Sequence, residues 1–253
     1  MKQGYFTGLL LVLAYAVSFA FYAWMGTMPD GSLFHEVWKG GVVVTVLIAL
    51  ILLVITYSVE RIVVLHRIAG RNDGGRLLRE LGNLLERGDI DMAVATCSKI
   101  DSLTARVVGS VLHRYRLCRE EAVCDRREMV RELEKASDVA SGRELPQLEE
   151  HLPILATLAS ISTMVGLLGT TLGMIRSFAA MATTGAPDTA SLSLGISEAL
   201  FNTALGIVGG ILGMVSFNLL SDRVEQLLQR TDDAVAVVVG LLETMQQRNG
   251  KGA

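Results

Sequence analysis

Two long apolar stretches, separated by a short turn, constrain this fold more than any other feature of the sequence. Residues 152–175 contain no charged side chain, and neither do residues 199–221. A membrane-spanning helix needs about 20 apolar residues, so each stretch is long enough to cross a bilayer. The segment between them, residues 185–188, contains a glycine and a proline, which disfavour helix. We therefore predict an antiparallel membrane hairpin over residues 151–221.

Depth in this hairpin can be estimated by counting residues outward from its tip. Thr170 and Thr203 are about equally far from a midpoint near Ala186 or Pro187, so at a rise of about 1.5 Å per residue their hydroxyls should lie at one level. Arg176 and Glu198 form a second matched pair, closer to the membrane surface.

Small residues recur one helical turn apart on both arms of the hairpin. This spacing lets membrane helices approach closely, and we expect it to mark their contacts. The glycines concerned are Gly166, Gly169 and Gly173 on the first arm, and Gly206, Gly210 and Gly213 on the second. Hydroxyl and amide side chains accompany them, among them Thr163 and Asn202. These polar groups should face protein, water or a partner helix.

Two further segments are candidates for membrane helices. Residues 40–65 begin with a run rich in Val, Ile and Leu and end in basic residues, which places that end in the cytoplasm by the positive-inside rule. Residues 5–26 fit either a retained membrane helix or the core of a signal peptide. Their aromatic end, and the lack of a small-residue cleavage site before Phe21, favour a retained helix.

Charge is concentrated in the middle of the chain. The sequence is 51% apolar with a mean hydropathy of +0.43, yet 16 of its 23 basic and 17 of its 26 acidic residues fall between residues 58 and 150. We predict a helical cytoplasmic domain over residues 66–150 and a cytoplasmic helix over residues 222–253. That helix has an apolar seam at heptad spacing, which could pack on the domain or on other copies of the chain; we favour the domain. The fold class expected is an all-α polytopic membrane protein.

No enzyme site can be assembled from this sequence. The three cysteines, Cys97, Cys118 and Cys124, show no metal-ligand spacing with the four scattered histidines, His35, His66, His113 and His151. Phosphate-binding and nucleotide-binding motifs are absent, and basic groups alternate with acids, which argues against nucleic acid binding. We expect no enzymatic activity, no metal and no cofactor.

The hairpin motifs resemble those of the MotA/TolQ/ExbB proton channel family, and the ExbB branch most. The resemblance rests on Gly166-Leu-Leu-Gly-Thr170 followed by Gly173-Met, and on Gly195-Ile-Ser-Glu-Ala-Leu-Phe-Asn-Thr203-Ala-Leu-Gly206. It implies a subunit of a motor driven by the proton-motive force in the inner membrane of a Gram-negative bacterium. By the same resemblance, a homopentamer would surround an ExbD-like single-span protein that carries a membrane aspartate. The motor would act on a TonB-like protein to energise outer-membrane transport.

The resemblance also implies roles for individual residues. Thr170 and Thr203 match the family's pore threonines, and we expect Thr163 and Asn202 to line the pore with them. Arg176 and Glu198 are expected near the pore mouth or at a subunit contact. The sequence departs from the family at Asn202, where a small apolar residue is common, and lacks the prolines often found near Thr163 and Leu212.

Other functions fit the same hairpin. A TolQ-like or flagellar-stator-like motor subunit would use the same pore to drive a different load. A passive scaffold would use the glycines only to hold an oligomer together in the membrane lipids.

Overall fold

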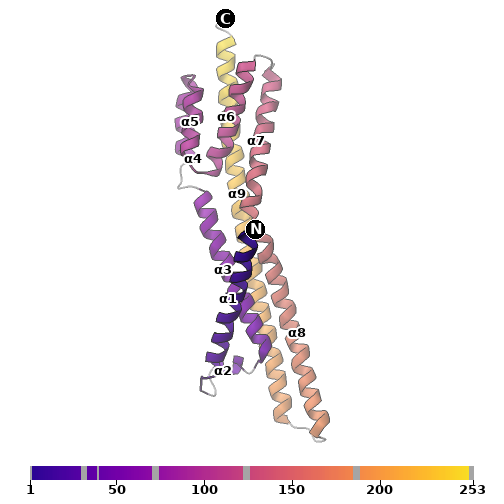
Figure 1. Cartoon of the computed structure of the whole chain (residues 1–253). Coiled ribbons are helices and arrows are strands. Elements are labelled where there is room, and N and C mark those ends of the chain that lie inside the picture. The colour runs from indigo at the N-terminus through magenta and orange to yellow at the C-terminus, as the bar shows by residue number, and fades with distance from the viewer. Residues whose placement is uncertain are drawn as a thin grey trace. The chain divides into compact units, whose positions relative to one another are not determined.

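The computed structural model describes residues 2–29, 33–38, 40–69, 74–121, 126–184 and 189–250. Every regular element in these ranges is an α-helix, labelled α1 to α9 in Figure 1. The chain divides into two compact units, one of residues 1–61 and 151–220 and the other of residues 62–150 and 221–253. The expected all-α class is confirmed. The predicted tip of the hairpin, residues 185–188, lies outside the described residues.

The first unit contains the apolar helices. They are α1 (Lys2–Met25), the short α2 (Leu33–Trp38), the start of α3 (Val42–Ile68), α8 (Leu152–Thr184) and the start of α9 (Thr189–Gly250). Three helical segments of the described chain are long and apolar enough to cross a membrane: Val42–Ile68, Arg127–Ala179 and Leu192–Gln247. The apolar stretch of α1, Val12–Met25, is shorter.

Apolar side chains point outward from α8 and α9 in the isolated chain. Met164 and Leu167 on α8 are 67% and 64% exposed, and Leu200 on α9 is 65% exposed. A helix that is apolar on all sides is either buried or in contact with lipid. These outward side chains fit contact with a bilayer or with other membrane helices.

Two hydrogen bonds join α1 to its neighbours α2 and α3 within the first unit. The buried Ser18 hydroxyl donates to the Thr45 carbonyl of α3 at 2.5 Å, and the Tyr22 hydroxyl donates to the Trp38 carbonyl at the end of α2 at 3.1 Å. The N-terminal helix therefore packs on α3.

The second unit is a bundle of amphipathic helices. It includes α4 (Gly74–Glu86), α5 (Ile90–Lys99), α6 (Leu103–Glu121) and α7 (Arg126–Glu149), and Figure 1 shows α6 and α7 side by side. The leucines of α4 at positions 77, 81 and 85 recur every four residues and are at most 1% exposed. This spacing places them on one face of the helix, directed to the core.

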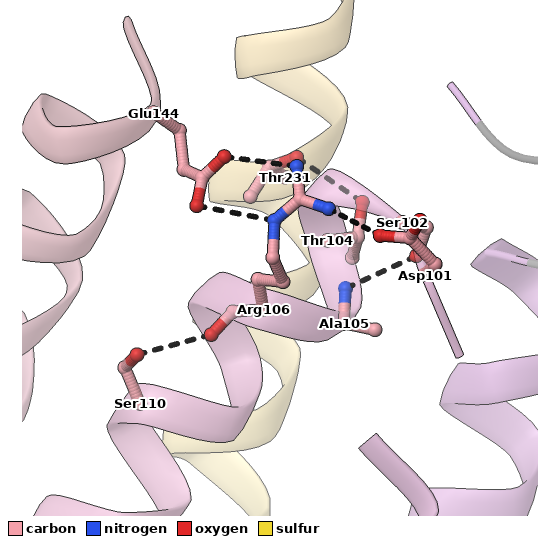
Figure 2. A network of polar contacts seen from close by, with 8 residues as sticks. All are labelled: Asp101, Ser102, Thr104, Ala105, Arg106, Ser110, Glu144 and Thr231. Carbon is pink, nitrogen blue, oxygen red and sulfur yellow. Dashed lines mark hydrogen bonds and ion pairs between the residues drawn. The ribbon is translucent and has the colours of Figure 1, made fainter. Parts of the chain in front are cut away.

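Ion pairs join the charged faces of this bundle. Arg106 of α6 donates two hydrogen bonds to Glu144 of α7, at 3.1 and 2.8 Å, and a third to Asp101 at 2.6 Å (Figure 2). Arg114 donates to Glu132 at 2.6 Å. Opposite charges thus lie against each other on neighbouring helices of this charge-rich segment.

The C-terminal half of α9 packs within the second unit. Its seam residues Val224, Val235, Val238 and Leu242 are at most 7% exposed, and the Thr231 hydroxyl lies 3.1 Å from that of Thr104 on α6. The favoured packing of the seam on this chain's own helices is therefore confirmed. The helix continues without a break from the first unit.

The junction between α7 and α8 is confined to two residues. Pro146 lies inside α7, and His151 has a φ of +63°, a left-handed backbone that residues with a side chain seldom adopt. The His151 ring lies 5.4 Å from that of Tyr57, and its Nδ1 is 3.3 Å from the Glu60 carboxylate. Contacts with α3 thus hold the start of α8.

Candidate functional site: the α8–α9 hairpin

The glycines of the hairpin lie where α8 and α9 come closest. A Cβ atom added at Gly166 would lie 2.8 Å from the Gly206 Cα, and one added at Gly213 would lie 2.7 Å from the Ala159 Cβ. At Gly173 the added atom would be 2.9 Å from the Gly195 carbonyl oxygen. These gaps are too small for any side chain, so backbone packs directly against backbone along the hairpin.

The same contacts fix the register of the two helices. Gly169 lies against Asn202, Gly210 lies against Thr163, and Arg176 meets Glu198. The residue numbers of these pairs add to 371, 373 and 374, and those of Thr170 and Thr203 also add to 373. The two threonines therefore stand at the same level, as counting from the tip predicts.

The hydroxyls of these two threonines differ in their bonding. Thr170 is half-buried, and its hydroxyl donates to the Leu167 carbonyl of its own helix at 2.6 Å. Thr203 is also half-buried, but its Oγ is enclosed and has no hydrogen-bond partner. A threonine in a helix has two accessible χ1 rotamers, so this hydroxyl can exchange places with its methyl group. Thr203 thus carries a polar group that this chain leaves unsatisfied.

Thr163 stands about two turns from Thr170 along α8. Its hydroxyl donates to the Ala159 carbonyl at 3.2 Å, and its side chain lies beside Gly210 of α9. Such a bond to the preceding turn satisfies a threonine hydroxyl without any partner. Thr163 is nonetheless exposed in the isolated chain, so its side chain stays open to a neighbour.

Asn202 lies in the interior of the first unit. Its side chain is fully buried, its Nδ2 donates to the Gly40 carbonyl at 3.1 Å, and its Oδ1 has no partner. A Cβ atom at Gly169 would lie 2.5 Å from that of Asn202, so the glycine makes room for the amide. This placement favours a packing role, tying the hairpin to the residues before α3, over a position in a pore wall.

Arg176 and Glu198 form an ion pair across the hairpin. Arg176 donates to the Glu198 carboxylate at 2.5 Å, and the Glu198 side chain is only 11% exposed. A Cβ atom at Gly41 would lie 2.5 Å from Glu198 Oε1, and Gly41 has a φ of +76°. The carboxylate therefore packs against a backbone position where only glycine fits well.

Gly40 and Gly41 are the residues of this site that sequence reasoning missed. They bond or abut Asn202 and Glu198, which are more than 150 positions away in the chain. The one available signal was a pair of glycines directly before an apolar run. That pair also fits an ordinary helix start, so it did not stand out.

The thiols of the second unit are placed for packing. Cys97 and Cys118 are buried, while Cys124 lies outside the described residues. Burial raises the pKa of Cys97 to about 11, which keeps its thiol protonated and unreactive at neutral pH. Of the residues that the structure describes, no group of three or more His, Cys, Asp or Glu side chains is arranged to hold a metal ion.

Known proteins resemble this chain, and the family match includes the hairpin. The profile of the MotA/TolQ/ExbB proton channel family matches residues 100–233. The Tol-Pal system protein TolQ of Pseudomonas aeruginosa is 34% identical over 130 residues, which cover 51% of this chain and 56% of TolQ. The biopolymer transport protein ExbB of Pseudomonas putida is 32% identical over 170 residues, 66% of this chain and 50% of that protein. ExbB of Salmonella typhimurium is 29% identical over 170 residues, 65% and 67% of the two chains. The match spans about half the length of the first two relatives.

Proposed function

Because the chain belongs to the MotA/TolQ/ExbB proton channel family, we propose that it is an ExbB-like subunit of an inner-membrane motor driven by the proton-motive force. Several copies, five by analogy with the family, would surround ExbD-like single-span helices, each bearing a membrane aspartate. Movement of these helices would be passed to a TonB-like protein that energises outer-membrane transport. Its longest match among the relatives described above, 170 residues, is to ExbB proteins and supports the ExbB-like assignment.

The unsatisfied hydroxyl of Thr203 is the observation that carries this proposal. A buried hydroxyl without a partner costs about 1–3 kcal/mol, so a native protein needs a reason to retain one. A polar group supplied by another chain, after rotation about χ1, would satisfy it. Thr170, at the same level, can also accept a hydrogen bond, since its own bond uses only its proton.

Thr170 and Thr203 would guide protons but could not carry them. Hydroxyl side chains do not ionise at neutral pH, so a carboxylate from the partner must take up and release the proton. One charge crossing 100 mV releases about 2.3 kcal/mol, so a few protons could drive a large rearrangement. Neutral and ionised forms of the partner's aspartate would prefer different positions against the threonines, and this difference would move the partner helix.

In this mechanism the ion pair of Glu198 and Arg176 would hold α8 and α9 together. Because the carboxylate is nearly buried and paired with Arg176, it is held in place. The pair joins α8 to α9 beside Gly41, so it would keep the outer part of the hairpin rigid while the partner moves.

A TolQ-like role is the second candidate, favoured by the 34% identity to TolQ of Pseudomonas aeruginosa. Expression in strains that lack either ExbB or TolQ separates the two. Restored uptake through TonB-dependent transporters supports the ExbB-like role, and restored envelope integrity supports the TolQ-like one.

Thr203→Val tests the proton pathway, because it replaces one hydroxyl by a methyl group of similar size. We expect gradient-driven activity to be lost while the oligomer still assembles. Thr56→Val is the matched control: Thr56 lies on α3, and its hydroxyl donates to its own helix at 2.7 Å. If Thr203→Val and Thr56→Val are equally active, the hairpin is a passive scaffold and the proposal fails.

A further inference from the structure

A pocket in the second unit collects basic side chains. Its volume is about 1150 Å³, and its walls come from the end of α3, from α4, from the α5–α6 connection and from the second half of α9. Four basic residues line it: Arg67, Lys99, Arg223 and Arg230. We call this cavity the basic pocket.

Among the residues that the structure describes, the cations of the basic pocket have no counter-ion within ion-pair distance. None of the four makes an ion pair with any residue that the structure describes, whereas Arg106, Arg114 and Arg116 of the same unit all do. Two acids, Asp101 and Asp233, also line the pocket, but the Asp101 carboxylate accepts a hydrogen bond from Arg106 at 2.6 Å (Figure 2). Among the described lining residues, four basic and two acidic side chains leave a formal charge of +2, so the pocket is suited to an anion.

Two of these cations lie one turn after exposed apolar side chains of their own helices. On α3, Val63 is 51% exposed and Arg67 follows it by one turn; on α9, Leu219 is 62% exposed and Arg223 follows it by one turn. Residues four apart share a helix face. Each helix therefore presents an apolar side chain and then a cation along one line, as a phospholipid presents an acyl chain and then a phosphate.

The remaining wall of the basic pocket is partly apolar. Leu78, Leu227 and Val237 contribute to it, and Val237 is 51% exposed. Pockets for small ligands usually enclose about 300–1,000 Å³, so this one is large enough for a phosphate with its glycerol. An apolar wall beside cations that pair with no described residue suits an anionic group that carries a hydrocarbon part.

We propose that the basic pocket binds the headgroup of an anionic phospholipid, with the phosphodiester against Arg67, Arg223 and Arg230. Basic pockets between helices at a membrane surface are common sites for such headgroups. The lipid would fasten α3, α4 and α9 together where the spans end. This inference requires α3 and α9 to be membrane helices, and it holds whether or not the chain is part of a motor.

The test uses the purified full-length oligomer, stripped of lipid in a neutral detergent. Phosphatidylglycerol, phosphatidylcholine and glycerol phosphate are titrated separately, and binding is followed by thermal stability and by native mass spectrometry. We expect phosphatidylglycerol to bind and to raise the melting temperature, with an affinity that falls as salt increases. Equal binding of phosphatidylcholine would overturn the proposal. Glycerol phosphate that binds as tightly as the lipid would overturn it too, since the pocket would then take soluble phosphates.

Variants locate the binding. The triple change Arg67→Gln, Arg223→Gln and Arg230→Gln should weaken phosphatidylglycerol binding on the order of 100-fold, since each basic residue contributes to the attraction. The triple Arg→Lys variant keeps the charge and should still bind, which guards against misfolding as the cause. The matched control changes Arg87, Arg127 and Arg131 to Gln; these are exposed and outside the pocket. Equal loss in the control would show a general charge effect and refute the site.

Discussion

The contact between the backbones of α8 and α9 at Gly166 gives a sharp prediction for Gly166→Ala. The added Cβ would lie 2.8 Å from the Gly206 Cα and 2.9 Å from the Asn202 carbonyl oxygen, both backbone atoms. Ordinary contact begins at 3.4 Å, so α8 and α9 must separate by about 0.6 Å (3.4 minus 2.8) at this point. Neither neighbour is a flexible side chain that could move aside, so the helices themselves must shift.

Overpacking of this kind costs about 1–3 kcal/mol. At about 2–4 °C per kcal/mol, the melting temperature should fall by roughly 2–12 °C. The measurement is thermal unfolding of the purified protein in detergent, followed by far-ultraviolet circular dichroism. Gly142→Ala is the matched control, because nothing lies within 4 Å of its Cβ and it sits inside α7. Alanine there should stabilise by about 0.5–1 kcal/mol through helix propensity. If both variants melt at or above the wild-type temperature, the backbone contact does not hold the hairpin together.

Three further changes probe charge and polar contacts in the second unit. The hydrogen bond from Arg114 lowers the pKa of Glu132 below 4.5. The ionised carboxylate therefore stabilises the fold above pH 4.5, and this contribution is lost as the pH falls through the folded-state pKa. Arg114→Gln should therefore flatten the acid side of the stability profile, and an unchanged profile would contradict the pairing. The pKa of Asp232 is raised above 3.8 by burial and by the nearby carboxylates of Asp138 and Asp233. The native fold therefore loses stability as the pH rises from 3.8 through the raised pKa. Asp232→Asn should then be more stable than wild type at neutral pH and equal to it below pH 3.8; a difference that persists in acid would point to another cause. Thr231→Val removes the 3.1 Å contact with Thr104 and should cost about 1 kcal/mol in a denaturant titration, whereas Thr244→Val, which loses only a bond within its own helix, should cost less.

Local patterns in the sequence accounted for the helices. The uncharged runs on either side of residues 185–188 predicted α8 and the first half of α9, because each run is long enough to cross a bilayer. The leucines of α4 and the seam of α9 repeat with the helical period, so their buried faces could be read directly. The register of the hairpin followed from its antiparallel topology, which is why Thr170 and Thr203 could be placed at one level.

The surroundings of the polar residues could not be read in this way. Whether Asn202 faces a pore or the bundle depends on how α3 packs against the hairpin, and no local pattern specifies that rotation. The contact of Gly41 with Glu198 depends on the same packing. The sequence changes from apolar to charged at Ser221 and Asp222. No helix-breaking residue stands at this point, and α9 continues through it.

Because α9 is one continuous helix, an inserted residue rotates every residue after it about the helix axis. Inserting a single alanine after Thr231, within the second unit, would advance every later residue by about 100° around the helix axis, turning the face that carries Val238 and Leu242 away from the helices on which it now packs. Seven alanines would bring that face back to within about 20°. The direction of that face would thus depend on how far the insert departs from a whole number of turns, while seven residues would also move it by about 10.5 Å along the axis.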